Sequence, residues 1–419
     1  MMKTYDSYKD SGIEWIGELP SNWKVRQIRS LFQERKEVVS DKDYEPLSVT
    51  KKGIVKQLDN VAKTDNNDSR KKVLTNDYVI NSRSDRKGSS GLSRYDGSVS
   101  VINIVLKMIT DVSDVRYYEY IFKSYDFIEE FFRNGKGIVW DLWSTRYSEM
   151  KYIKISLPPL SEQEQIVSYL DEKTSLIDEM VEKKKRKIEL LKEYRTSLIN
   201  TVVTKGLNPD VPMKDTGIEW IGEIPRHWEL KRLKHLSQIE YGISPPDTTY
   251  NDEGIGSVLI NGPVEYSESD FGFTRSLKWT TEPKKFTQKG SLLFCLRGST
   301  TGRLNITHDD VSIGRGVCSI YSNHNQWYLI YSMFCVRNWL SGQLSGSTFP
   351  SVTKDDVDNY HICNPPLSEQ EQIVSYLDEK TSEIDKTIEL EKKKIELLKE
   401  YRQSLISNVV TGKIKVVSE

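Results

Sequence analysis

Clusters of basic side chains among small hydroxyl residues are the feature of this sequence that could bind a ligand. One cluster is the loop NSRSDRKGSSGLSR at residues 81–94, and the other is CLRGSTTGR at residues 295–303, followed by Arg315. Lys and Arg contact phosphates, and a guanidinium can also donate two hydrogen bonds to one guanine edge. Both loops therefore predict contact with nucleic acid, although a solvated basic loop remains the alternative for any single residue.

The candidates for contact with DNA come from both halves of the chain, in segments that are rich in Gly, Ser and Asn and typical of recognition loops. They are Lys51, Lys52, Arg83, Arg86, Lys87, Arg94, Lys136, Arg146, Tyr241, Arg275, Lys278, Arg297, Arg303, Arg315, Thr348 and Lys354.

Each sequence motif that could indicate a catalytic site lacks a part that the chemistry requires. The string NPPL at residues 364–367 is similar to the motif with which adenine-N6 methyltransferases hold the target amino group, but residues 157–160 read LPPL at the corresponding place, and no glycine-rich cofactor loop accompanies either. The string GSTTGR at residues 298–303 lacks the Lys-Ser/Thr ending of an ATP phosphate loop. All five histidines fall in the second half, and the carboxylates show no metal-ligand spacing. We therefore expect no catalytic residue and no metal site.

Length and composition exclude several classes of protein. A chain of 419 residues is too long for one ordinary core, and 37% hydrophobic with 10% aromatic residues exclude wholesale disorder. No run approaches 18 apolar residues, and the polar start lacks the apolar stretch of a secretory signal, so we expect a soluble, cytoplasmic protein. With 60 basic and 61 acidic residues, a basic surface must be balanced by acidic residues elsewhere. Four cysteines without a C-x-x-C pair predict buried thiols.

The chain contains two internal repeats. Residues 10–20, DSGIEWIGELP, return at 215–225 with nine of eleven residues identical, and residues 158–204 return at 365–411 with 37 of 47 identical. Between these blocks lie two segments of nearly equal length but little obvious similarity. The pattern predicts a pseudo-twofold molecule in which constant blocks carry two different heads. Recent duplication with drift of one half is the alternative.

Each longer repeat predicts a long helix. From residue 162 and from residue 369 the blocks lack Gly and Pro until their ends, and Ser161 with Glu164 fits a capping box, as does Ser368 with Glu371. Apolar residues follow the alternating spacing of four and three that is typical of a coiled coil. These seam residues are Ile177, Val181, Ile188, Leu191, Leu198, Ile384, Ile388, Ile395, Leu398 and Leu405. Helices that cover only their own domains are the alternative.

The variable segments predict mixed α/β domains. Strand-like runs at residues 78–80, 100–106, 257–260 and 291–296 lie among Gly, Ser and Asn loops. The predicted fold class is therefore α+β, with two mixed α/β domains on two long antiparallel coiled-coil helices.

PPLSEQEQIV leading twice into a long helix, with GIEWIGE before each variable segment, closely resembles the specificity subunit (HsdS) of type I restriction-modification enzymes. The resemblance spans essentially the whole chain and includes YGISPP at residues 241–246 and STFPSVT at residues 347–353, whereas WDLWSTRYS at residues 140–148 does not reproduce the latter string. It implies that each variable segment is a target-recognition domain for one half of a split DNA sequence, and that the helices set the distance between the halves.

The resemblance also implies partners and cofactors. Two modification subunits would bring S-adenosylmethionine and the methyl-transfer site, and restriction subunits would bring ATP-driven translocation with Mg²⁺, so this chain would hold no cofactor and would not be an enzyme. The remaining alternatives are a self-sufficient DNA methyltransferase or nuclease and a coiled-coil scaffold that does not touch DNA.

The resemblance implies the following division of the chain. We expect an N-terminal arm at 1–20, a first target-recognition domain at 21–160, a central helix at 161–210, a repeated arm at 211–225, a second target-recognition domain at 226–367, and a C-terminal helix and tail at 368–419.

Overall fold

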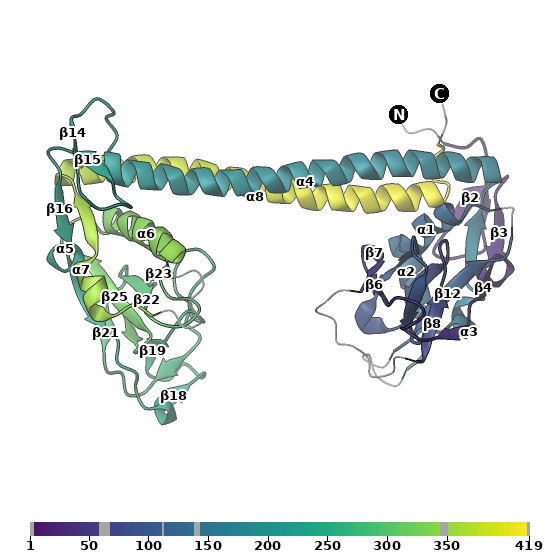
Figure 1. Ribbon diagram of the computed structural model, residues 1–419, viewed down its shortest axis with the longest axis horizontal. Helices are drawn as coiled ribbons and strands as arrows, with labels where there is room; N and C mark the ends of the chain where they lie inside the picture. The colour runs from purple at the N-terminus through teal and green to yellow at the C-terminus, as the bar shows by residue number, and fades with distance from the viewer. Residues whose placement is uncertain (1–3, 58–67, 111–112, 138–142, 344–350, 417–419) are drawn as a thin grey trace. The chain divides into compact units, whose positions relative to one another are not determined.

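The chain forms two compact units in the computed structural model, which describes residues 4–416 except 58–67, 111–112, 138–142 and 344–350 (Figure 1). The first unit consists of Met1–Lys185 and Lys392–Glu419, and the second of Arg186–Glu391. Each unit holds one α/β body and part of both long helices, α4 (Leu160–Lys205) and α8 (Leu367–Val410). The units thus divide each long helix, whereas the domains expected from the sequence follow the ends of the repeats.

The body of the first unit is built on a four-stranded antiparallel sheet of order β10-β9-β12-β4 and a three-stranded sheet of order β11-β8-β5. The strands are β4 (Phe32–Glu34), β5 (Val38–Val39), β8 (Arg70–Val73), β9 (Tyr78–Asn81), β10 (Ser90–Leu92), β11 (Gly97–Ser100) and β12 (Asn103–Met108). Helices α1 (Val115–Lys123) and α2 (Tyr125–Arg133) supply aromatic side chains to the core. Phe122 of α1 lies 4.9 Å, between ring centroids, from Tyr78 of β9, and both are buried.

The body of the second unit repeats the four-stranded sheet. Its order, β23-β22-β25-β17, corresponds strand by strand to β10-β9-β12-β4, and a five-stranded sheet of order β18-β20-β19-β24-β21 accompanies it. The strands are β17 (Ser237–Tyr241), β18 (Tyr250–Asn251), β19 (Ser257–Ile260), β20 (Trp279–Thr280), β21 (Phe286–Thr287), β22 (Leu292–Cys295), β23 (Leu304–Ile306), β24 (Val311–Ile313) and β25 (Val317–Ser322). The variable segments therefore share a sheet that their sequences do not reveal.

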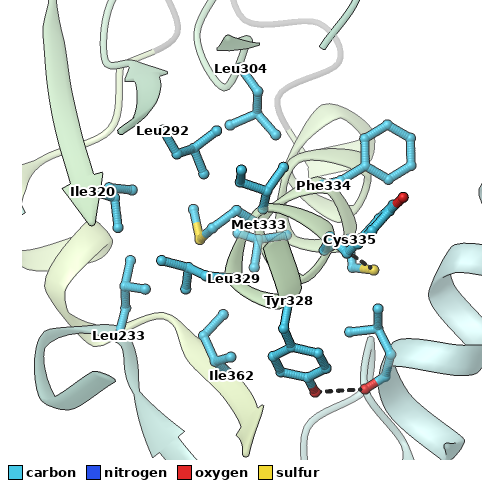
Figure 2. Packing of buried hydrophobic residues seen from close by; sticks show 14 of the residues in the cluster. Leu233, Leu292, Leu304, Ile320, Tyr328, Leu329, Met333, Phe334, Cys335 and Ile362 are labelled. Atoms are coloured by element: carbon cyan, nitrogen blue, oxygen red, sulfur yellow. Dashed lines mark hydrogen bonds between the residues drawn. The ribbon is translucent and has the colours of Figure 1, made fainter. Parts of the chain in front are cut away.

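Helix α6 (Gln326–Gln343) covers the sheet of the second unit. Figure 2 shows Leu329 and Met333 of α6 packed toward Leu292 and Ile320 of the sheet, and all four are buried. Tyr328, also on α6, donates from its hydroxyl to the carbonyl of Cys363 at 2.9 Å. The four cysteines are buried free thiols, as predicted, and burial raises the pKa of Cys363 to about 12.

Shorter elements complete both units. In the first they are β1 (Tyr8–Asp10), β2 (Glu18–Pro20), β3 (Lys24–Gln27), η1 (Ile28–Ser30), β6 (Leu47–Thr50), β7 (Gly53–Lys56), η2 (Ser84–Arg86), α3 (Tyr147–Met150) and β13 (Lys154–Leu157). In the second they are β14 (Met213–Asp215), β15 (Glu223–Pro225), β16 (Glu229–Arg232), α5 (Leu233–Leu236), η4 (Asp247–Thr249), α7 (Lys354–Asn359) and β26 (His361–Asn364).

The predicted fold class is confirmed, with two local corrections. The run expected as one strand at residues 100–106 is interrupted, because a turn at Val101–Ile102 separates β11 from β12. Helices α4 and α8 begin at Leu160 and Leu367, so Ser161 and Ser368 lie inside the first turn and are not N-cap residues. The carbonyls of Pro159 and Pro366 instead accept the first helical N–H groups.

Helices α4 and α8 pack as an antiparallel pair (Figure 1). In the first unit Arg402 donates to Asp178 at 2.9 Å, and in the second Arg195 donates to Asp385 at 3.2 Å. These ion pairs join positions that correspond across the repeat, because both the arginines and the aspartates are 207 residues apart. Of the seam residues, Ile177, Val181, Ile188, Ile384, Ile388, Ile395 and Leu405 are buried, and Leu191, Leu198 and Leu398 are half-buried.

Within the second unit, a further charged pair joins the two long helices at the seam. Glu391, only 3% exposed, accepts a hydrogen bond from Lys187 at 3.0 Å.

Each long helix ends before a glycine with φ of +75°, Gly206 or Gly412, a conformation that favours glycine. In the first unit a Cβ on Gly412 would meet Pro20, and in the second a Cβ on Gly206 would meet Trp228, so the two helix ends lie against the repeated arms.

A tryptophan just after each arm anchors the body of that unit to the start of a long helix. Trp23 and Trp228 are fully buried, and their indole N–H groups donate to Glu162 at 3.1 Å and to Glu369 at 2.9 Å. A second contact is also duplicated: the hydroxyl of Tyr120 donates to Asp171 at 2.5 Å in the first unit, and that of Tyr331 donates to Asp378 at 2.7 Å in the second. Both bodies are thus fixed to the helices by equivalent bonds.

Candidate nucleic-acid interface

The first basic loop follows β9 and is tied to residues 143–145. The N–H of Thr145 donates to the carbonyl of Ser82 at 3.0 Å, and the N–H of Ser84 donates to that of Trp143, also at 3.0 Å. Arg83 forms a backbone bridge with Ser144 between these two bonds. The loop backbone is therefore fixed, while the Arg83 side chain remains half exposed and contacts Asp85 at 3.0 Å.

Arg83 and Arg146 line one cleft of about 580 Å³ in the first unit. The single acidic residue of its lining is Glu34. Three further basic residues complete the lining, namely Lys36, Lys71 and Lys151. Lys71 pairs with Glu34 at 2.8 Å, and this one carboxylate balances one of the five basic charges, so the remaining excess of positive charge attracts phosphates. These lysines are far apart along the chain and belong to no loop motif, so sequence patterns do not single them out.

The second basic loop follows β22 and is held in the same way. The N–H of Val352 donates to the carbonyl of Leu296 at 2.9 Å, and the N–H of Leu296 donates to the carbonyl of Gly316 at 2.9 Å. Arg297 lies two residues after β22 and Arg315 lies two residues before β25, so both adjoin the same paired end of these neighbouring strands, where Cys295 pairs with Val317. Both are exposed, and neither side chain makes a hydrogen bond or ion pair with any residue that the structure describes.

Arg83 and Arg297 occupy equivalent positions. Arg297 forms a backbone bridge with Ser351, as Arg83 does with Ser144. Short helices of matching position, α3 and α7, begin three residues after these serines. Asp356 and Thr353 form a full capping box at α7, whereas at α3 Glu149 accepts from the N–H of Arg146 and the arginine side chain caps nothing. STR at residues 144–146 thus corresponds in structure to SVT at 351–353, although the two variable segments show little sequence similarity. The correspondence comes from backbone bonds, which sequence comparison does not detect.

Several predicted contact residues are engaged within the protein. Lys87 pairs with Glu129 at 2.7 Å and lies over the Phe132 ring. The guanidinium of Arg303 donates to the carbonyl of Ser267 at 2.6 Å. Other engaged candidates are Arg275, which donates to the carbonyls of Val264 and Tyr266, Lys136, which lies 3.5 Å from Glu149, and Lys278, which lies over the Tyr250 ring. These contacts give each residue a structural role and reduce its freedom to contact DNA.

Tyr241 and Lys354 form a small cluster beside the second loop. The Tyr241 hydroxyl donates to Asp358 at 2.6 Å, and the Lys354 ammonium lies 4.9 Å from the ring centroid. Burial, reinforced by the Asp358 carboxylate, raises the pKa of Tyr241 well above its usual value. The phenol therefore stays protonated and positions Lys354 and the start of α7.

The remaining candidates lie at exposed turns. Lys51 and Lys52 occupy the turn between β6 and β7, and Arg94 lies between β10 and β11. Arg86 is 3.7 Å from Asp85. Thr348 lies outside the described residues. The cleft thus brings Arg83 and Arg146 together, and Arg297 and Arg315 adjoin the same paired end of β22 and β25. No described contact joins Lys51, Lys52 and Arg94 to either group.

The catalytic motif that the sequence suggested at residues 364–367 has a structural role. Asn364 ends β26, and its side-chain carbonyl accepts a weak hydrogen bond from Gln370 at 3.5 Å, just before α8 begins. No group of three or more His, Cys, Asp or Glu residues in the described chain could hold a metal ion. No helix among the described residues is long and apolar enough to cross a membrane.

Comparison with known proteins identifies the class. The family model "Type I restriction modification DNA specificity domain" matches residues 20–190 and again residues 225–400. The chain therefore belongs to this family, and it carries two copies of the domain. It is a type I restriction-modification specificity subunit with two target-recognition domains.

Individual relatives agree with this assignment. The chain is 25% identical over 432 residues to a Methanocaldococcus jannaschii protein named as the MjaX specificity subunit of a type I restriction enzyme, with 96% of each chain covered. It is 26% identical over 282 residues to the MjaVIII specificity subunit of the same organism, with 63% of each chain covered.

Two solved structures share the fold. A chain from a structure that describes complex assembly and conformational transition of the type I R-M system superposes with a TM-score of 0.74, at 20% identity and 94% coverage of this chain and 98% of that one. The HsdS subunit from Thermoanaerobacter tengcongensis superposes with a TM-score of 0.56, at the same identity and coverage.

Proposed function

We propose that each unit reads one half of an asymmetric, bipartite DNA target, and that the chain contributes positioning and not chemistry. The observation that carries this proposal is the shared loop frame. Arg83 and Arg297 stand at equivalent positions on matching sheets, but different side chains surround them. One frame with two sets of tip residues would recognise two different half-sites on one duplex.

The duplicated helix anchors support two identical partners. The bonds of Glu162 and Asp171 in the first unit recur at Glu369 and Asp378 in the second, so both units hold the repeated helix segment in the same way. Two modification subunits bound there would supply S-adenosylmethionine and methyl transfer. Restriction subunits, with ATP and Mg²⁺, would join that complex.

The antiparallel helices would set the spacing between the half-sites. A helix rises about 1.5 Å per residue, so the lengths of α4 and α8 would set this spacing. The family membership supports this role, as does the continuity of the two helices.

Methylation mapping in cells tests the proposal. The gene is expressed with its modification subunits as wild type, as Arg83→Ala and as Arg297→Ala, and methylated adenines are mapped across the genome. We expect a bipartite motif for the wild type, and relaxed sequence preference in a different half of that motif for each variant, because one good base contact contributes about 1–3 kcal/mol of discrimination. Relaxation of both halves by one variant, or a motif that is not bipartite, would contradict the proposal.

Binding to random DNA separates the two roles of an arginine. An equal loss of affinity on target and random DNA would make Arg297 a phosphate contact, since phosphate contacts carry no sequence information. Lys278→Ala is the control, because it also removes one positive charge from the second unit. The Lys278 ammonium lies over the Tyr250 ring.

A further inference from the structure

The turn between β11 and β12 exposes two large apolar side chains at the edge of the basic cleft. Val101 is 48% exposed and Ile102 is 42% exposed, and both line the cleft together with Arg83 and Arg146. The hydroxyl of Ser82 donates to the carbonyl of Ile102 at 2.6 Å, which fixes the turn against the start of the basic loop. Gly, Asn, Asp and Ser are the usual residues of tight turns, so turn formation does not explain this pair.

The second unit carries different chemistry at the same place. There, Arg315 and Gly316 precede β25, as Val101 and Ile102 precede β12, and both strands lie between the equivalent neighbours of their sheets. Each pair of residues therefore precedes the strand that pairs with the one before the corresponding arginine, Arg83 or Arg297. The second unit therefore has the cationic Arg315 at this turn, where the first unit has the apolar Val101 and Ile102.

We propose that Val101 and Ile102 contact the C5-methyl group of a thymine in the half-site that the first unit reads. This inference rests on the proposed function and deepens it. In the major groove, the thymine methyl is the apolar feature of a base edge, and small apolar side chains are suited to contact it. The surrounding lysines and arginines hold the phosphates, which brings the turn to the base edges.

The charge around the turn favours DNA over a protein partner as its occupant. Five basic residues line the cleft against one carboxylate, so its charge complements a polyanion. Arg315, at the equivalent position of the second unit, is suited to a guanine edge instead. The two half-sites would then differ in the kind of base read at equivalent positions.

Deoxyuridine substitution tests the proposal because it removes only the methyl group. The full complex with its modification subunits is titrated with duplexes in which each thymine of the mapped first half-site is replaced in turn by deoxyuridine. Burial of one methyl group corresponds to about a fourfold change in affinity. We expect about three- to tenfold weaker binding at one thymine position, and no such loss at that position for the double variant Val101→Ala, Ile102→Ala.

Two controls make the result specific. Ile109→Ala removes an apolar side chain that is 49% exposed on the same unit but does not line the cleft, and it should keep the wild-type response to deoxyuridine. Thermal unfolding of the double variant should match the wild type, because Val101 and Ile102 belong to no core cluster.

The possible outcomes separate this inference from the proposed function. Sequence-specific binding without any response to deoxyuridine in the first half-site, a half-site without thymine, or an unchanged response in the double variant would each overturn the methyl contact while leaving the proposed function intact. Loss of all sequence preference in the wild-type complex would instead refute the proposed function.

Discussion

Removal of the carboxylate that anchors each buried tryptophan should destabilise the protein by a predictable amount. Glu162 accepts hydrogen bonds from Trp23 and from the Tyr5 hydroxyl. Glu369 accepts one from Trp228 and is also hydrogen-bonded, at 2.8 Å, to the exposed ring of His227. In Glu162→Ala or Glu369→Ala, a fully buried indole N–H loses its acceptor, which costs about 1–3 kcal/mol. We expect Glu162→Ala to be the larger loss, because it also frees the half-buried Tyr5 hydroxyl.

Urea unfolding followed by circular dichroism measures this effect. Glu162→Gln and Glu369→Gln are the matched controls, since the amide oxygen keeps an acceptor for the indole, and each should cost less than about 1 kcal/mol. The m-value should stay constant, so that the midpoint shift reports stability. Alanine variants within about 0.3 kcal/mol of the wild type, or glutamine variants as unstable as alanine variants, would refute the anchoring role.

Four further predictions follow from the proposed function and the fold. Insertion of seven residues into both α4 and α8 keeps the seam in phase and lengthens each helix at about 1.5 Å per residue. At about 3.4 Å per base pair, the unspecified gap of the methylated motif should become about 3 base pairs longer. An unchanged gap in the mapped motif would contradict the spacing role. The purified chain alone, given S-adenosylmethionine, ATP, Mg²⁺ and DNA, should transfer no methyl group and cleave no strand in a radiolabel and gel assay, and turnover would make it an enzyme. Target affinity measured by fluorescence anisotropy should fall steeply with salt, and Arg146→Ala should reduce the slope of log affinity against log salt by about one. Hydrogen bonds from Thr353 lower the pKa of Asp356 below its usual 3.8, so its contribution to α7 is present above that pH and is lost as the pH falls through the lowered value. Over that range the protection of α7 amides against exchange, measured relative to the intrinsic rate at each pH, should fall in the wild type but not in Asp356→Asn.

The sequence predicted those features that depend on periodic or repeated residues. The alternating seam spacing and the absence of Gly and Pro led to both long helices, and the 207-residue repeat predicted that the two halves are related. The helices begin two residues earlier than the expected caps allow, because the carbonyls of Pro159 and Pro366, and not Ser161 and Ser368, provide the first acceptors. Local hydrogen bonds of this kind depend on backbone angles that composition does not encode.

The candidate interface was predicted less completely for a physical reason. Loop residues such as Arg83 and Arg297 stood out by type, but their equivalence arises from backbone bonds to Ser144 and Ser351 on distant segments. Lys36, Lys71 and Lys151 meet in one cleft only after the sheet forms. The exposed turn at Val101 was hidden because its two apolar residues extend a strand-like run.

Under the proposed function, stability and specificity would depend on different side chains of the same loops. Lys87 and Arg303 satisfy internal acceptors, so their replacement disturbs the frame, whereas Arg297 and Arg315 make no side-chain hydrogen bond or ion pair with the described residues. Val101 and Ile102 are likewise outside the cores. Surface substitutions at such positions cost little folding free energy. These exposed residues can therefore change with little effect on the sheets, the helix anchors or the seam. New side chains at these positions, on an unchanged backbone, would recognise a new half-site.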